Sequence, residues 1–157
     1  MSKLPDPLKR RDILYGQDTP PEVLKEYGDL YLQEGRANDA VEFFGQACYK
    51  EGLFHIRQMA LEEGDLFLFS RATELLRQEV SSDDWRKLAE KALEKGKYLF
   101  ALKAFEKVGD REGIEKARKK LKEIIEERGG DGDNKIGKRQ EQRATKDTGR
   151  APGGDFE

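Results

Sequence analysis

The chain has 157 residues, which is enough for one domain with a tail. Hydrophobic residues make up 36% and charged residues 39%, so the chain is unusually polar for a compact globule. A thin, elongated repeat fold explains this balance, because each repeat buries only the faces that meet its neighbours. The formal charge of −2 is near neutral, and bulk electrostatics give no reason to expect a nucleic acid or a membrane as partner.

Cysteine content and hydropathy bear on the compartment. Cys48 is the single cysteine, so no disulfide can form within the chain, which suits a reducing environment. The N-terminal residues lack the apolar core of a signal peptide, and no apolar run approaches the roughly 18 residues of a membrane helix. The sequence therefore predicts a soluble, cytoplasmic protein.

Residues 1–18 are predicted to form an N-terminal arm. Prolines and Gly16 interrupt this stretch, which also carries a short basic cluster. We expect a loosely ordered segment in which Ile13, Leu14 and Tyr15 can pack on the first hairpin. The alternative is an arm that binds a partner.

The first predicted helical hairpin covers about 19–48. Thr19 and Glu22 have the spacing of a capping box at a helix start. Apolar residues then recur three and four apart, which is the pattern of an amphipathic helix. Gly28 lies inside this apolar stripe, where a glycine costs about 1 kcal/mol, and close approach of a second helix would offset that cost. Gly35 ends the first helix.

The second hairpin is less regular. Its helices, at about 52–63 and 66–79, flank a turn at Gly64. The return helix opens with four consecutive apolar residues, Leu66–Phe69, which cannot all lie on one helical face. We expect at least one of them to be exposed, or to contact another hairpin or a partner.

The third hairpin begins at the capping stretch Ser81–Asp84 and turns at Gly96. A last helix, at about 111–128, has an apolar stripe and a charged outer face, as the end cap of a stacked fold requires. The remaining residues are rich in glycine and charge, which predicts a disordered tail. The expected organisation is an arm at 1–18, a helical repeat domain at 19–128 and a polar tail at 129–157.

An internal repeat is the strongest signal in the sequence. Ala60–Ala72 and Ala92–Ala104 share Ala-Leu-Glu, a glycine and a final alanine at the same offsets, and Tyr31–Ala40 is a weaker copy. Self-similarity at about 30 residues is typical of stacked repeat proteins. The sequence therefore predicts an all-α fold of about three antiparallel helical hairpins with a C-terminal capping helix.

These hairpins resemble tetratricopeptide repeats over about 20–128. The first hairpin carries the family's apolar, small, aromatic and turn residues as Leu24, Tyr27, Gly28, Tyr31, Gly35, Ala40, Phe44 and Ala47. The third carries them as Trp85, Leu88, Ala89, Ala92, Gly96, Ala101 and Phe105, with Val108 closing. The second hairpin departs from the pattern, since Arg57 and Phe69 occupy positions of small residues. The turn glycines are also spaced by 29 and 32 residues, closer than the family's usual repeat of about 34.

The resemblance implies a right-handed α-solenoid that binds a protein or peptide in a groove lined by the first helices. By position, the groove-facing residues that it implies are Lys25, Asp29 and Leu32, then Phe54, Gln58 and Leu61, and then Arg86, Glu90 and Leu93. Family members that clamp a C-terminal carboxylate use lysine and asparagine at such places. The asparagine is absent, so chaperone-tail binding is not predicted.

Residues suited to catalysis or metal binding are sparse. His55 is the only histidine and is interpreted as a surface or packed residue, and Cys48 as a small core residue. Neighbouring acids such as Glu62 and Glu63 point about 100° apart on a helix and do not converge. A zinc site would need more Cys or His, and no phosphate-binding glycine motif occurs. The sequence predicts no enzymatic activity, no metal and no cofactor.

Phe67 and Phe69 are the sharpest candidates for contacts with a partner, because exposed aromatic residues anchor interfaces. The simpler interpretation is that Leu66–Phe69 packs between repeats. We predict a non-catalytic adaptor or scaffold that binds a protein or peptide of unknown identity. One alternative is a nucleic-acid-associated protein that uses the basic run at 118–122 and the tail, although glutamates surround that run. Another is an accessory domain that regulates a catalytic subunit.

Overall fold

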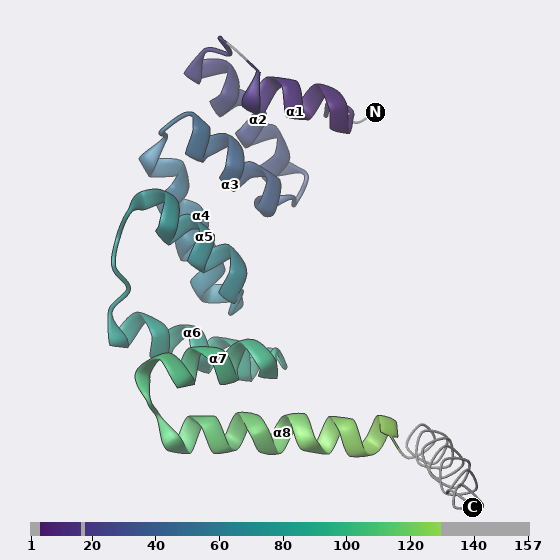
Figure 1. The fold of residues 1–157 in the computed structure, drawn as a ribbon, viewed down its shortest axis with the longest axis vertical. Coiled ribbons are helices and arrows are strands. Elements are labelled where there is room, and N and C mark those ends of the chain that lie inside the picture. Colours follow the sequence, from purple (N-terminus) through teal and green to yellow (C-terminus); the bar gives the residue numbers. More distant parts are fainter. Residues whose placement is uncertain (1–3, 17, 130–157) are drawn as a thin grey trace, which may run out of the picture. The chain divides into compact units, whose positions relative to one another are not determined.

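The computed structural model describes residues 4–16 and 18–129. All regular structure in this part of the chain is α-helical, so the predicted all-α class is confirmed (Figure 1). The helices are α1 (Pro7–Tyr15), α2 (Pro21–Gln33), α3 (Ala37–Gln46), α4 (Lys50–Glu63), α5 (Leu66–Leu76), α6 (Ser82–Glu94), α7 (Tyr98–Val108) and α8 (Arg111–Gly129). None of these described helices is long and apolar enough to cross a bilayer.

Consecutive helices pack in three pairs, α2 with α3, α4 with α5 and α6 with α7. The turns inside the pairs contain Gly35, Gly64 and Gly96, whose φ angles are 74°, 66° and 76°. In each turn the residue after the glycine donates its N–H across the helix end, from Arg36 to Tyr31, from Asp65 to Ala60 and from Lys97 to Ala92, at 2.8, 2.9 and 2.8 Å. This is a Schellman C-cap, whose left-handed residue favours glycine. The glycine is the constant feature of the sequence repeat because all three turns share this structure.

The second helix of each pair also ends at a residue with a left-handed backbone. These residues are Cys48, Arg77 and Gly109, with φ angles of 52°, 54° and 68°, and each lies thirteen positions after its turn glycine. The first helices are equally regular, since the caps Pro20, Tyr49 and Ser81 each lie fifteen positions before the glycine. Each pair therefore spans the same number of residues, from the cap of its first helix to the left-handed residue that ends its second.

The unequal spacing of the turn glycines arises between the pairs. Tyr49 caps α4 directly after Cys48, whereas three residues, Gln78–Val80, separate Arg77 from the cap of α6. Figure 1 shows the long connector between α5 and α6 that contains them. The packing between pairs also changes at this connector. The first pair contacts the second through α3, which touches both α4 and α5, whereas the second pair contacts the third through α4 and α6.

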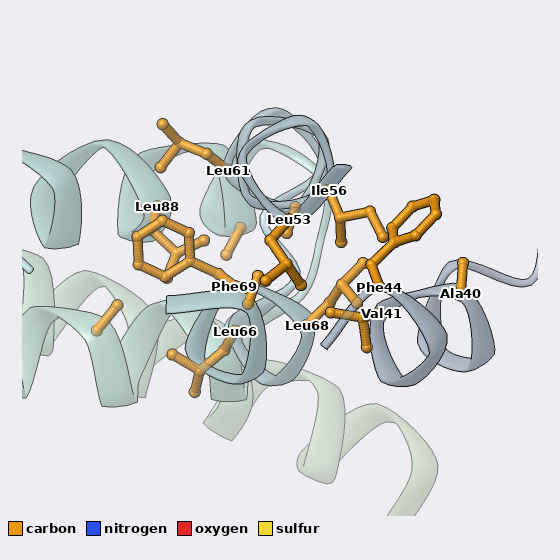
Figure 2. Close-up of a cluster of buried hydrophobic side chains, with 14 of the residues drawn as sticks. Ala40, Val41, Phe44, Leu53, Ile56, Leu61, Leu66, Leu68, Phe69 and Leu88 are labelled. Carbon is orange, nitrogen blue, oxygen red and sulfur yellow. The ribbon is translucent and has the colours of Figure 1, made fainter. Parts of the chain in front are cut away.

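The hydrophobic core runs through all three pairs. Figure 2 shows one part of it, in which α3, α4, α5 and α6 each contribute buried apolar side chains. Gly28 confirms the predicted close approach of α2 and α3, because a Cβ atom built there would lie 2.5 Å from the ring of Phe44. Full burial of a large apolar side chain stabilises by about 1.5–3 kcal/mol, so this cluster holds the pairs together.

The N-terminal segment differs from the loosely ordered arm expected from the sequence. Residues 7–15 form α1, which begins where the Asp6 carboxylate accepts the N–H of Lys9 at 2.9 Å. Leu14 is buried, and Arg10 pairs with Asp39 of α3 at 2.8 Å. Ile13 is partly buried against the core, as expected, whereas Tyr15 is 63% exposed. The helix is hard to predict because two adjacent apolar residues and the Arg10 side chain dock it, rather than an apolar stripe.

Two predicted helix caps have opposite outcomes. The Thr19–Glu22 capping box does not form, since Pro20 is the N-cap of α2 and no side chain makes a cap hydrogen bond there. The Ser81 hydroxyl does accept the N–H of Asp84, at 3.1 Å.

The chain divides into two units, Met1–Ala117 and Arg118–Glu157, with the boundary inside α8. The first turns of α8 belong to the first unit, where Ala117 is fully buried and Gly113 lies against Phe105. The described part of the second unit continues the helix to Gly129. The predicted tail otherwise lies outside the described residues.

Candidate functional site

The apolar run at the start of α5 is divided between the core and the surface. Leu66, Leu68 and Phe69 are buried, whereas the Phe67 side chain is 62% exposed. Phe69 is therefore not available to a partner, and its predicted role as an anchor is wrong. Phe69 lies at the same distance after its turn glycine as Ala40 does in the first pair. Ala40 is buried in the core, so the larger phenylalanine ring fills space between helices at this position.

Arg57 and Phe69, the two departures from the repeat pattern, contact each other. The Arg57 guanidinium lies 4.7 Å from the centre of the Phe69 ring, which packs edge-on against Trp85 at 5.8 Å. The same guanidinium donates to Asp84 Oδ2 at 2.8 Å and to Thr73 Oγ1 at 3.1 Å. Both departures therefore serve one structural junction that joins α4, α5 and α6.

Phe67 lies at the edge of a hollow of about 640 Å³, which we call the α5–α7 hollow. Its lining comes from α5, the following connector, α6 and α7: Leu66, Phe67, Ser70, Thr73, Glu74, Gln78, Val80, Trp85, Lys103, Glu106 and Lys107. Ligand sites in proteins commonly have such a volume and a largely apolar lining. Gln78 and Val80 belong to the three extra connector residues, so the irregularity in repeat length helps to build the hollow.

Aromatic rings and ammonium groups surround the α5–α7 hollow. Phe67 packs edge-on against Phe100 of α7, with ring centres 5.1 Å apart and planes at 82°. The Lys103 ammonium lies 5.7 Å from the centre of the Phe67 ring, and the Lys107 ammonium lies 5.9 Å from that of Trp85. Such cation–π contacts at exposed sites contribute about 0.5–1 kcal/mol, so they position the rings.

The predicted groove along the first helices is only partly assembled. Gln58, Leu61 and Glu90 line one cavity of about 320 Å³ between α4 and α6. Most of its other lining residues are charged, and Leu61 is buried at its base. This cavity has less apolar surface than the α5–α7 hollow.

The other predicted groove residues lie apart from the lining of that cavity. Lys25 is exposed on α2 with its ammonium 4.5 Å from the centre of the Tyr49 ring, and Asp29 is half-buried on the same helix. Phe54 is 46% exposed on α4. Arg86 lies 3.8 Å from Asp83 on the exposed side of α6. The groove is interrupted because the first pair reaches the second through α3, not through α2 alongside α4.

Cys48 is exposed, so its prediction as a core residue is wrong. It ends α3 in the left-handed conformation that Gly109 has at the end of α7, outside the buried stripe. His55 was expected to be a surface or packed residue, and it is exposed on α4. Within residues 4–16 and 18–129, no three Asp, Glu, His or Cys side chains are placed to hold a metal ion.

The clearest electrostatic feature joins α3 to α5. The Arg71 guanidinium makes two hydrogen bonds to the Glu42 carboxylate, at 2.7 and 2.8 Å. These bonds outweigh desolvation and lower the pKa of Glu42, and they raise the pKa of Arg71. In the first pair, burial raises the pKa of the Tyr31 hydroxyl. These groups support helix packing and lie outside the α5–α7 hollow.

Sequence reasoning missed Trp85, Phe100, Lys103 and Lys107 as members of a surface site. Trp85 was assigned to the repeat framework and the other three to no role, because a repeat pattern does not show where neighbouring pairs move apart. One feature of the sequence could have indicated this site: the spacing from Gly64 to Gly96 is longer than the spacing from Gly35 to Gly64. Comparisons of the chain with protein families, with curated proteins and with solved structures find no match.

Proposed function

We propose that this chain is a non-catalytic adaptor or scaffold that binds a partner protein through the α5–α7 hollow. Its framework is a right-handed solenoid of tetratricopeptide-like hairpins, with α8 as the capping helix. The three equal helix pairs and their identical glycine turns support the proposed framework.

Phe67 is the observation that carries the proposed binding role. A large aromatic side chain with 62% exposure costs solvation free energy unless something covers it. Its contact with Phe100 restricts the ring, so a partner would lose little entropy in ordering it. Aromatic residues held in this way at the edge of an apolar hollow are typical anchors of protein interfaces.

The experiment compares proteins captured by the full chain with those captured by Phe67→Ser. Leu8→Ser is the matched control, because Leu8 is 67% exposed but lies on α1 and does not line the hollow. A partner should be lost from the Phe67 variant and retained by the Leu8 variant.

Binding of the purified partner then provides the quantitative test. Trp85 is the single tryptophan and lines the hollow, so its emission should change on binding. Phe67→Ser should weaken the affinity at least tenfold, as expected for an aromatic anchor. Equal affinities of the parent and Phe67→Ser would place the partner elsewhere, and turnover of a small molecule without a protein partner would contradict the adaptor role.

A further inference from the structure

The α7 side of the α5–α7 hollow carries two lysines, each beside an aromatic ring. The Lys103 ammonium lies 5.7 Å from the centre of the Phe67 ring. The Lys107 ammonium lies 5.9 Å from the centre of the Trp85 ring. The two lysines are four residues apart in α7, which places them on one side of the helix and about 6 Å apart along its axis. A single ligand in the hollow can therefore reach both ammonium groups.

The charge of these two lysines is not balanced by the protein around them. Both side chains are exposed, and neither forms an ion pair within residues 4–16 and 18–129. The face of an aromatic ring attracts an ammonium group but carries no charge that would neutralise it. The α7 side of the hollow therefore attracts negative charge.

Two acids, Glu74 and Glu106, also line the hollow. Glu106 belongs to α7 and interacts with another group of the chain. Glu74 belongs to α5, where it accepts a hydrogen bond from Arg71 at 3.2 Å. Arg71 is shared with Glu42, so the α5 side of the hollow keeps some negative charge. A ligand with acidic groups would therefore place them towards α7 and away from α5.

Between these two sides the hollow is concave and largely apolar. Its volume of about 640 Å³ is in the range of sites that enclose a small ligand. A side chain that protrudes from a short segment can enter such a site, as in other modes of peptide recognition. The apolar surface that would contact this side chain comes from Leu66, Phe67, Val80 and Trp85.

We propose, as an extension of the adaptor role above and resting on it, that the partner binds this hollow with a short acidic segment. A large apolar side chain of the segment enters the hollow, and one or two carboxylates next to it in sequence contact Lys103 and Lys107. Contacts between exposed charges are individually weak. The apolar side chain therefore supplies most of the affinity, and the carboxylates supply orientation and selectivity.

Selection from a library of random short peptides displayed on phage tests this proposal, with the full chain as bait. Sequences that bind Phe67→Ser as well as the parent are discarded, so the retained sequences are those that need the hollow. These should combine aspartate or glutamate with a large apolar residue. Retained sequences that are basic or uncharged would overturn the acidic segment and leave the hollow as a binding site.

Lysine variants then test the charge contacts, with one retained peptide as the probe and calorimetric titration as the measurement. The double variant Lys103→Gln/Lys107→Gln should bind the peptide about tenfold more weakly than the parent. The matched control is Lys87→Gln/Lys91→Gln, which has the same spacing and the same loss of charge on α6 but lines the α4–α6 cavity instead. This control should bind like the parent. Equal affinities of the parent and the first double variant would overturn the acidic segment.

Glu74 provides a test of the opposite sign. Because its carboxylate lies on the α5 side of the hollow, Glu74→Gln should strengthen binding of the acidic peptide, by about twofold. A peptide that binds Glu74→Gln more weakly than the parent would contradict the placement of its acids towards α7.

Changing the peptide completes the test. A version with its acids replaced by amides should bind the parent about tenfold more weakly, and Lys103→Gln/Lys107→Gln should then weaken it little further. Added salt should weaken the acidic peptide and not the amide version. An amide peptide that binds the parent as tightly as the acidic one would overturn the proposal. A library without any Phe67-dependent sequence would overturn the short segment, whereas the adaptor role is decided separately by protein capture with Phe67→Ser.

Discussion

The junction between the first and second helix pairs differs from the junction between the second and third. In the first, α3 contacts both helices of the next pair, and Gly35 has no atom near the place of a Cβ. In the second, α4 packs along α6, and Gly64 lies against the backbone of Ala92. The pairs have equal lengths, so the three residues Gln78–Val80 account for the changed register. Connectors between repeats can thus reshape a surface without altering the repeats.

The largest expected difference in stability is between variants of the two phenylalanines of α5. Phe69→Ala should lower the free energy of unfolding by about 3–5 kcal/mol, because it leaves a cavity at the filled centre of the second junction. Phe67→Ala should cost about 1 kcal/mol or less, since the ring is largely exposed and loses mainly its contact with Phe100. Urea denaturation of both variants measures the difference. Equal losses would mean that Phe67 is a core residue and not an anchor.

The turn glycines distinguish the junctions directly. Gly64→Ala should destabilise by about 3 kcal/mol, because the new Cβ would lie 2.5 Å from the Ala92 backbone and the φ angle is left-handed. Gly35→Ala should cost about 1 kcal/mol, since only the left-handed conformation is strained there. Thermal melts of the two variants give the comparison. A Gly35 variant that is as unstable as the Gly64 variant would show that α2 packs along α4.

The Glu42–Arg71 pair should make stability depend on pH. The folded-state pKa of Glu42 is below its ordinary value of 4.5, so the pair stabilises above pH 4.5 and loses this contribution as pH falls through the lower folded pKa. Glu42→Gln should remove about 1 kcal/mol near pH 7, since the pair is partly exposed, and less below pH 4. Urea midpoints between pH 3 and 7 measure this. A constant difference across this range would contradict the assigned pair.

The smallest expected effect concerns the lysines at the hollow. Lys107→Gln should change the free energy of unfolding by about 0.5 kcal/mol and shift the emission of Trp85, because the ammonium over its ring is removed. Lys116→Gln is the control, since Lys116 pairs with Glu112 and no ring among the described residues contacts it. Indistinguishable spectra of the parent and the Lys107 variant would show that the lysine does not position this wall of the hollow.

Local patterns predicted the helices from α2 to α8 and the turns within the pairs, but tertiary packing decided the candidate site. The turns at Gly35, Gly64 and Gly96 could be predicted because a left-handed turn favours glycine. The equivalent ends of α3 and α5 could not be predicted in this way, since Cys48 and Arg77 adopt that conformation without glycine.

The α5–α7 hollow was only partly predictable. The four apolar residues at 66–69 showed that one side chain could not enter the core, and the structure identifies it as Phe67. Neither the pairing of Arg57 with Phe69 nor the place of Trp85 at the surface follows from a single helix, because each depends on how neighbouring pairs approach one another.

Ile125 lies fifteen positions after Asp110, the residue before α8, which is the register that the turn glycines have relative to the caps of α2, α4 and α6. Each of those glycines reverses the backbone, so that an antiparallel helix follows. A branched residue is unfavourable in the left-handed conformation, and α8 continues straight through this register to Gly129. A single backbone preference thus decides whether a helix of this length turns or continues.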